Sequence, residues 1–189
     1  VVSGYAEELA AETSGETAGM AQQILQKSDD IASRSRKAAT IERVLTGDDT
    51  LVSLDLERVL QEAVESVRAD HPGAELRLHV PENCRVNAHD ALDVALSNVI
   101  ENAVVHNEGT PSVTVGAECG AASATVTISD DGPGIPEAEL SPLEQGEETQ
   151  LSHSSGIGLW LVSLIVERSG GDVSFESTED GTVVRITLR

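Results

Sequence analysis

The sequence predicts an α+β fold in which a helical hairpin is followed by one mixed, mostly antiparallel sheet with helices on one face. Two patterns indicate this. Apolar residues recur every seven positions between residues 20 and 45, which is typical of a helical hairpin or coiled coil. After residue 47, helix and strand patterns alternate to the C-terminus, which favours a two-layer arrangement. We therefore expect two domains, residues 1–46 and 47–189.

The first domain is predicted to be purely helical. Residues 1–18 form the end of one helix and a turn rich in Gly, Ser and Thr, and a second helix runs from Met20 to about Leu45. Its stripe of Ile24, Ile31 and further apolar residues cannot be buried by a hairpin alone. We therefore expect residues 1–46 to dimerise into a four-helix bundle.

The second domain begins at Thr50, after the break at Gly47. Asp55 is a suitable N-cap for a helix over residues 56–70, which ends at His71-Pro72-Gly73. Another helix is expected over residues 90–107, and an apolar helix opens at the glycine turn near residue 156. Alternating or apolar segments predict strands over residues 75–80, 85–87, 112–118, 123–129, 172–177 and 182–188.

The composition is acidic, with 33 Asp and Glu against 12 Lys and Arg. This balance disfavours nucleic-acid binding. It is similar to that of proteins from salt-loving microorganisms, in which concentrated salt screens the self-repulsion of like charges. The alternative is an ordinary soluble acidic protein.

The two cysteines, Cys84 and Cys119, have no metal-site spacing and indicate no disulfide framework, so we expect a cytoplasmic protein. No apolar run approaches the length of a membrane span, and we expect no membrane contact within this chain. The chain begins at Val1 without a methionine, and we expect it to be a fragment of a longer protein.

Asn98 and Asn102 lie four residues apart in the helix over residues 90–107, whose other face is apolar. Amide oxygens can complete the coordination of a magnesium ion that is otherwise held by water and nucleotide phosphates. A solvated helix face is the alternative explanation of such a pair. Taken alone, the pair favours that explanation.

The segment Asp130-Asp131-Gly132-Pro133-Gly134 is a common turn sequence, and a turn is its default interpretation. It directly follows a buried strand, where a carboxylate needs a donor. The exocyclic amine of adenine is such a donor, and glycines let the backbone approach a flat base.

A third segment, Ser154-Ser155-Gly156-Ile157-Gly158, precedes an apolar helix. Free amides and the helix dipole at such a position attract phosphate. The segment is neither a Walker loop nor a dinucleotide fingerprint, and glycine also serves tight packing.

Together, NVIEN (98–102), DDGPGIP (130–136) and SSGIGLWLV (154–162) resemble the ATP-binding domain of sensor histidine kinases, within the GHKL (Bergerat-fold) superfamily. The resemblance covers residues 51–189. The sequence GEETQLSHSSGIGLWLV (146–162), together with the acidic composition, is similar to that of histidine kinases of halophilic archaea. It implies a two-layer α+β sandwich that binds ATP and Mg²⁺. The nucleotide-binding residues that it implies are Asn98, Asn102, His106, Asp130, Gly132, Gly134, Ile135, Ser155, Gly156, Gly158 and Leu159.

Within this set, the resemblance implies that Asn102 ligates magnesium, Asn98 positions the triphosphate and Asp130 receives the adenine amine. Gly156 and Gly158 would hold phosphates. The implied reaction is transfer of the γ-phosphoryl group to a histidine, and then to the receiver domain of a response regulator.

Three features depart from the family pattern. Residues 1–70 contain no histidine, so we expect the acceptor histidine upstream of this chain. Val105 and His106 stand where relatives have lysine and tyrosine. The lid segment between Glu137 and His153 carries no Lys or Arg, and Leu143 stands in for the phenylalanine of the family. Magnesium and dissolved potassium must then offset more of the phosphate charge, which predicts a salt-dependent nucleotide affinity.

Three alternatives remain open. Hydrolytic members of the superfamily place a glutamate at the position of Asn98 to activate water, and asparagine cannot act as that base. Anti-sigma-factor serine kinases share the ATP-binding fold but lack a helical hairpin before it. The predicted helix within residues 19–46 therefore argues against this alternative. A non-catalytic dimerising scaffold that has lost ATP is the third, and the intact Asn102 and Asp130 argue against it.

Overall fold

The computed structural model describes residues 2–47, 50–107, 109–135, 156–178 and 180–189. The chain divides into two compact units, Val1–Leu45 and Thr46–Arg189. No helix in the described part of the chain is long and apolar enough to cross a membrane.

The first unit consists of helix α1 (Val2–Glu12) and most of helix α2 (Glu16–Thr46). The hydroxyl of Thr13 donates to the carbonyl oxygen of Leu9 at 2.6 Å, at the end of α1. Gly15 has a φ of 65°, which glycine adopts without strain and which lets the chain reverse within three residues. The second helix therefore begins earlier than the predicted Met20. The large apolar side chains that are exposed in this unit are Tyr5, Leu9, Met20, Ile24, Ile31 and Leu45.

The second unit holds a five-stranded sheet with the order β2-β4-β5-β7-β6. Its strands β2 and β4 pair in parallel, and every other neighbouring pair is antiparallel. The strand bounds are β2 Glu75–His79, β4 Ser112–Cys119, β5 Ala124–Asp130, β6 Asp172–Thr178 and β7 Gly181–Leu188.

The prediction of a single sheet is wrong. Strands β1 (Leu51–Asp55) and β3 (Arg85–His89) form a separate antiparallel pair, in register from Leu51↔His89 to Asp55↔Arg85. Alternation in the sequence predicts that a segment is extended, but it does not determine which distant segment completes its hydrogen bonds.

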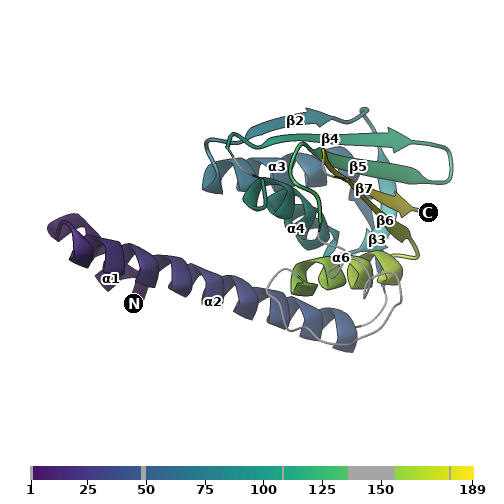
Figure 1. Cartoon of the computed structure of the whole chain (residues 1–189). Coiled ribbons are helices and arrows are strands. Elements are labelled where there is room, and N and C mark those ends of the chain that lie inside the picture. The colour runs from purple at the N-terminus through teal and green to yellow at the C-terminus, as the bar shows by residue number, and fades with distance from the viewer. Residues whose placement is uncertain (1, 48–49, 108, 136–155, 179) are drawn as a thin grey trace. The chain divides into compact units, whose positions relative to one another are not determined.

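Helices α3 (Leu56–Asp70), α4 (Leu92–Val105) and α6 (Gly156–Arg168) cover one face of the five-stranded sheet (Figure 1). Helix α4 packs against both α3 and α6. Because side chains alternate between the faces of a strand, every second residue of β7 is buried beneath the helices. The predicted two-layer α+β fold is confirmed, and its core is aliphatic. The largest fully buried side chains include Leu60, Leu92, Leu96, Ile100, Ile128, Leu161, Ile165 and Ile186.

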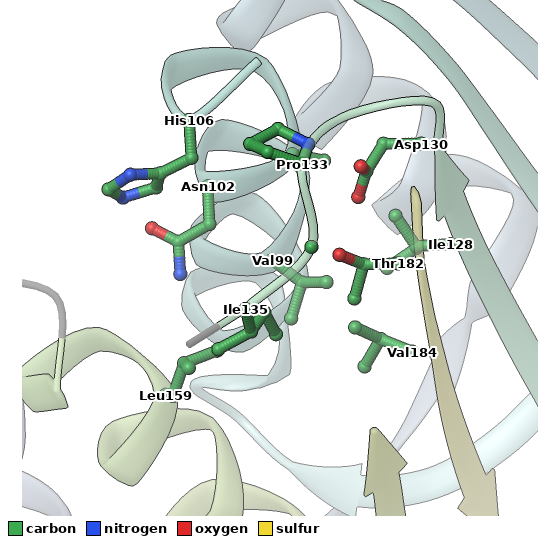
Figure 2. Close-up of a pocket in the computed structure, with 12 residues that line it drawn as sticks. Val99, Asn102, His106, Ile128, Asp130, Pro133, Ile135, Leu159, Thr182 and Val184 are labelled. Atoms are coloured by element: carbon green, nitrogen blue, oxygen red, sulfur yellow. The ribbon is translucent and has the colours of Figure 1, made fainter. Parts of the chain in front are cut away.

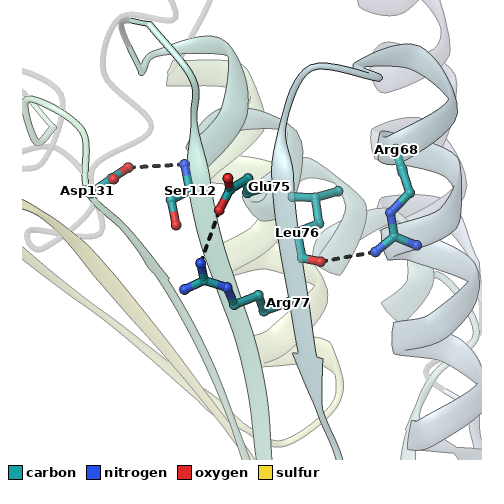
Figure 3. A network of polar contacts seen from close by, with 6 residues as sticks. All are labelled: Arg68, Glu75, Leu76, Arg77, Ser112 and Asp131. Carbon is teal, nitrogen blue, oxygen red and sulfur yellow. Dashed lines mark hydrogen bonds and ion pairs between the residues drawn. The ribbon is translucent and has the colours of Figure 1, made fainter.

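Strand β2 lies at one edge of the sheet, where a strand exposes unpaired backbone groups. Nη2 of Arg68, on α3, donates to the carbonyl oxygen of Leu76 at 3.0 Å (Figure 3). Arg77 and Glu75 form an exposed ion pair at 3.0 Å on the same strand. These charged side chains protect an edge that could otherwise pair with another chain.

A disulfide joins Cys84 to Cys119, with their Cα atoms 5.9 Å apart. The expectation that these cysteines form no disulfide framework is wrong. The parallel register pairs His79 with Gly116, so the residues that follow β2 lie close to the end of β4. The two cysteines are 35 residues apart in sequence, and this strand pairing brings the segments that carry them close together. Their spacing therefore gives no support for a cytoplasmic location.

Candidate functional site

A cavity of about 190 Å³ lies between α4, the inner face of β5 and β7, the turn after β5, and the start of α6 (Figure 2). Whole small molecules occupy pockets of about 300–1,000 Å³, so a cavity of this size suits one flat ring of a larger ligand. Its walls are apolar except at four residues. The lining residues are Val99, Asn102, Ala103, His106, Ile128, Asp130, Pro133, Gly134, Ile135, Leu159, Thr182 and Val184.

Helix α4 supplies one wall. Val99 and Ala103 are buried, whereas Asn102 is half-buried and His106 is exposed. Asn102 and His106 lie four residues apart and project from the same side of the helix. The backbone N–H of His106 donates to the carbonyl oxygen of Asn102 at 3.1 Å, which places His106 at the end of the helix. One side of the cavity thus carries an amide and an imidazole.

Asn98 lies one turn earlier in α4 and is only 4% exposed. Its Nδ2 donates to the carbonyl oxygen of Val94 at 2.8 Å. Its Oδ1 is buried and has no hydrogen-bond partner in the structure. A buried acceptor without a partner is unfavourable, so an asparagine here indicates a role other than stability.

Asp130 is the last residue of β5, and its carboxylate faces the cavity from the side opposite α4. The backbone N–H of Gly132 donates to its Oδ1 at 2.9 Å, and both the backbone N–H and the hydroxyl of Thr182 also donate to the carboxylate. Burial raises the pKa of Asp130 above its ordinary value of 3.8, and these hydrogen bonds offset part of the rise. The charge of Asp131 adds to the rise.

The turn after β5 is held against strand β6. The backbone N–H of Ile135 donates to the hydroxyl of Ser177 at 2.6 Å. Gly134 has a φ of 81°, and a Cβ at this position would collide with the carbonyl oxygen of Thr178. Glycine is therefore required at residue 134.

The structure brings together six of the predicted nucleotide-binding residues at the cavity. These six are Asn102, His106, Asp130, Gly134, Ile135 and Leu159.

Four of the other five predicted residues do not line the cavity. Gly132 does not line the cavity but donates to Asp130, and Asn98 is buried in the body of α4. Gly156 is the first residue of α6, and Gly158 is buried in its first turn. Ser155 and the predicted lid segment lie outside the described residues.

Sequence reasoning missed Thr182, which is 5% exposed and hydrogen bonds to Asp130. It lies opposite Asp130, because Ser129 pairs with Val183 in antiparallel strands. A signal was present in the sequence. Thr182 is in phase with the inward-facing Val184, Ile186 and Leu188, and a polar residue in that phase must meet a polar partner.

The arrangement can bind a flat, largely apolar ring that carries an N–H donor. The ring would lie between the apolar walls, and the carboxylate of Asp130 would accept its hydrogen bond. The described residues contain no cluster of three or more His, Cys, Asp or Glu side chains that could hold a metal ion alone.

Residues 87–189 match a protein-family model whose description is "Histidine kinase-, DNA gyrase B-, and HSP90-like ATPase". The match covers more than half of the chain and includes α4, the turn after β5 and α6. The chain belongs to this family. Within the family, the chain is similar to the sensor-type histidine kinase PrrB of Mycobacterium tuberculosis, with 31% identity over 172 residues. That alignment covers 85% of this chain and 38% of PrrB.

Solved structures of histidine kinases are also similar to this chain. The ATP-binding domain of PrrB from Mycobacterium tuberculosis is 29% identical, with a TM-score of 0.58 over 75% of this chain and 96% of that one. Full-length ShkA in complex with AMPPNP shares the fold, at 21% identity and a TM-score of 0.69 over 99% of this chain and 42% of ShkA. Residues 87–189 therefore belong to a histidine-kinase-type ATP-binding domain of the GHKL fold. The chain spans less than half the length of PrrB.

Proposed function

We propose that this chain is the catalytic core of a two-component sensor histidine kinase, which binds Mg-ATP and transfers the γ-phosphoryl group to a histidine. The observation that carries the proposal is the cavity with one carboxylate, Asp130, on one side and the amide of Asn102 on the other. The family match to ATPases, and the AMPPNP bound to the similar ShkA, support a nucleotide as the ligand.

The base would lie in the cavity with its exocyclic amine directed at Asp130. A hydrogen bond to an ionised group contributes about 1.5–3 kcal/mol, which is enough to favour adenine over guanine, because guanine presents a carbonyl at the corresponding position. Gly132 and Gly134 would leave the backbone of the turn close to the base.

Magnesium fits the residues at the mouth of the cavity. Mg²⁺ is usually held by one or two protein oxygens, with phosphates and water in the other positions, and it does not need a cluster of carboxylates. Asn102 would supply an amide oxygen, and Mg²⁺ would neutralise phosphate charge. The unpartnered Oδ1 of Asn98 supports a role for this residue in positioning the triphosphate.

The tail of the nucleotide would extend toward the N-terminus of α6. This helix starts at Gly156, and its first amides have no partner within the helix, so they can donate to phosphate oxygens. Ser155, Gly156 and Gly158 are the proposed phosphate contacts. His106, which is exposed at the other side of the cavity, is a proposed further contact.

The transferred group would pass to the imidazole of a histidine that lies outside residues 1–70, and then to an aspartate of a response-regulator receiver domain. The Pγ–O bond to ADP would break as the Pγ–N bond to the imidazole forms. Positioning and charge neutralisation supply most of the acceleration in such transfers, so no general base is needed beside Asn98.

Residues 1–46 are proposed to form a homodimer. Apolar side chains such as Tyr5 and Ile31, at 66% and 68% exposure, are poorly placed in a lone hairpin. Pairing two copies into a four-helix bundle would bury them.

We also propose a halophilic origin, because the net charge is −21 and a molar salt solution would screen its self-repulsion. A cytoplasmic location remains our proposal, without support from the cysteines.

The deciding experiment is calorimetric titration of the 189-residue chain with Mg-ATP and Mg-GTP in molar KCl. We expect Mg-ATP to bind, Mg-GTP to bind much more weakly, and Asp130→Asn to lose Mg-ATP binding. Asp93→Asn, which removes an equal charge from the exposed side of α4, is the matched control and should bind normally. If the unmutated chain binds no adenine nucleotide, the non-catalytic scaffold is favoured and the proposal fails.

A further inference from the structure

Asp131 connects three segments of the second unit through one carboxylate oxygen. The side-chain Nδ2 of Asn107 donates to Oδ1 of Asp131 at 2.7 Å. The backbone N–H of Ser112 donates to the same oxygen at 3.1 Å, as Figure 3 shows. These hydrogen bonds hold the pKa of Asp131 below its ordinary value, with that from Asn107 the larger cause. We name Asn107, Ser112 and Asp131 the 107–131 clasp.

The clasp lies directly beside the candidate site. Asn107 immediately follows His106, at the end of the helix that supplies one wall of the cavity, and Asp131 immediately follows Asp130, which supplies the opposite wall. Ser112 begins β4, whose next residue, Val113, pairs with Asp130. The clasp therefore joins the end of α4 to the turn that carries the carboxylate.

The side chain of Asn107 also packs against the turn itself. A Cβ added to Gly132 would lie 2.9 Å from Oδ1 of Asp130 and 3.3 Å from Cγ of Asn107. Residue 132 is buried at this point, and its backbone N–H is the group that donates to Asp130. The side chain of Asn107 therefore lies beside the residue whose backbone N–H orients the carboxylate.

We propose that Asn107 and Asp131 are positioning residues for nucleotide binding, which fix the separation of Asp130 from Asn102 and His106 before the ligand arrives. The inference rests on the proposed function and deepens it. Neither residue lines the cavity, so neither is proposed to contact the nucleotide. A site whose walls are already fixed loses less conformational freedom on binding, and it therefore binds more tightly.

The clasp also allows a specific test, because its two side chains are an amide and a carboxylate of equal length. In the double variant Asn107→Asp/Asp131→Asn, the new carboxylate at position 107 can accept from the new amide at position 131. Because Asn107 and Ser112 both donate to the same oxygen of Asp131, the side chain at position 131 rotates so that its new amide nitrogen faces position 107 while its oxygen still accepts from the backbone N–H of Ser112. Both hydrogen bonds are thus restored with the net charge unchanged, whereas Asn107→Asp alone places two carboxylates together.

The experiment measures the Kd for Mg-ADP by calorimetry and the Tm without ligand. The proteins are the unmutated chain, Asn107→Ala, Asn107→Asp and the exchanged double variant. We expect each single variant to weaken Mg-ADP binding about tenfold, which is the scale of losing a group that orients a binding residue. We expect the double variant to return to within about threefold of the unmutated Kd. The matched control is Glu62→Ala, which removes an exposed ion pair on α3 and should leave the Kd unchanged.

A purely structural clasp would lower the Tm of the single variants and leave their Kd unchanged well below the Tm, and that result would overturn the inference. Failure of the exchanged variant to recover binding while its Tm recovers would also overturn it. If the unmutated chain binds no Mg-ADP, the proposed function fails first. The two failures are therefore distinguishable.

Discussion

The backbone N–H of Gly132 donates to Oδ1 of Asp130 at 2.9 Å, so the turn that leaves β5 holds the carboxylate at the end of that strand. Thr182 holds the same carboxylate from the neighbouring strand β7. Despite these donors, burial keeps the pKa of Asp130 above 3.8. The carboxylate of Asp130 is therefore protonated at a higher pH than that of an ordinary aspartate.

Adenine-nucleotide affinity is expected to fall on acidification at a higher pH than an ordinary aspartate would give. The proposed hydrogen bond needs the ionised form of Asp130, and this form is lost as the pH falls through the raised pKa. Titration calorimetry with ADP between pH 7 and pH 4 measures this. An affinity that does not change over that range would contradict the assigned role of Asp130.

Asp130→Asn is expected to preserve or raise the Tm at pH 7 while it removes binding. Because the pKa is raised in the folded state, the contribution of Asp130 to stability is greatest below the ordinary pKa of 3.8 and declines as the pH rises through the folded pKa. The advantage of the variant in Tm should therefore shrink toward pH 4. Thermal melts of both proteins at pH 7 and pH 4 test this, and a large loss of Tm at pH 7 would contradict it.

Thr182→Val is expected to weaken Mg-ADP binding about threefold to tenfold, which corresponds to one lost hydrogen bond of about 0.5–1.5 kcal/mol. Without the hydroxyl the pKa of Asp130 should rise further, so the midpoint of the pH profile of binding should move upward. Thr127→Val, on the outer face of β5, is the matched control. Equal profiles for the two variants would show that Thr182 does not act on Asp130.

Asn98→Leu is expected to weaken Mg-ATP binding more than Mg-ADP binding, with little loss of stability. The substitution removes a buried oxygen that has no partner, together with a single helical side-chain bond to Val94, and the apolar side chain has a similar volume. Calorimetry with both nucleotides and a thermal melt measure the two effects. A drop of more than about 3 kcal/mol in the free energy of unfolding would instead indicate a structural role for Asn98.

Cys84→Ala with Cys119→Ala is expected to lower the free energy of unfolding by about 3–4 kcal/mol, from the loss of a loop closure over a separation of 35 residues. Urea unfolding measures the change. Dithiothreitol should lower the stability of the unmutated protein by a similar amount and leave that of the variant unaltered. If dithiothreitol lowered the stability of the unmutated protein and of the variant equally, the disulfide would be excluded as the cause of that loss.

Local patterns in the sequence predicted much of the fold. The bounds of α3 were predicted as 56–70, and Asp55 caps this helix through the backbone N–H of Arg58 at 3.4 Å. These features depend on neighbours within a few residues. The pairing of β1 with β3 and the Cys84–Cys119 bond depend on segments 30 or more residues apart, whose register alternation alone does not set.

In the candidate site too, contacts between distant segments could not be predicted from the sequence. Asn102 and Asp130 were predicted because each belongs to a contiguous motif of a known family. Thr182 and Asn107 belong to no such motif, and their importance comes from the strand or turn that lies opposite them in space. A sequence shows which residues are chemically able to bind, but the partners that orient them are determined by tertiary contacts.

The parallel pairing of β2 with β4 also has a kinetic consequence. The chain between these strands contains all of α4, so this helix is the crossover that parallel pairing requires. Contacts between distant segments form slowly, because the intervening chain must first be ordered. The cavity depends on a still more distant pairing, that of β5 with β7, which supply Ile128 and Val184 to its walls, so the gain of affinity during refolding should follow that pairing.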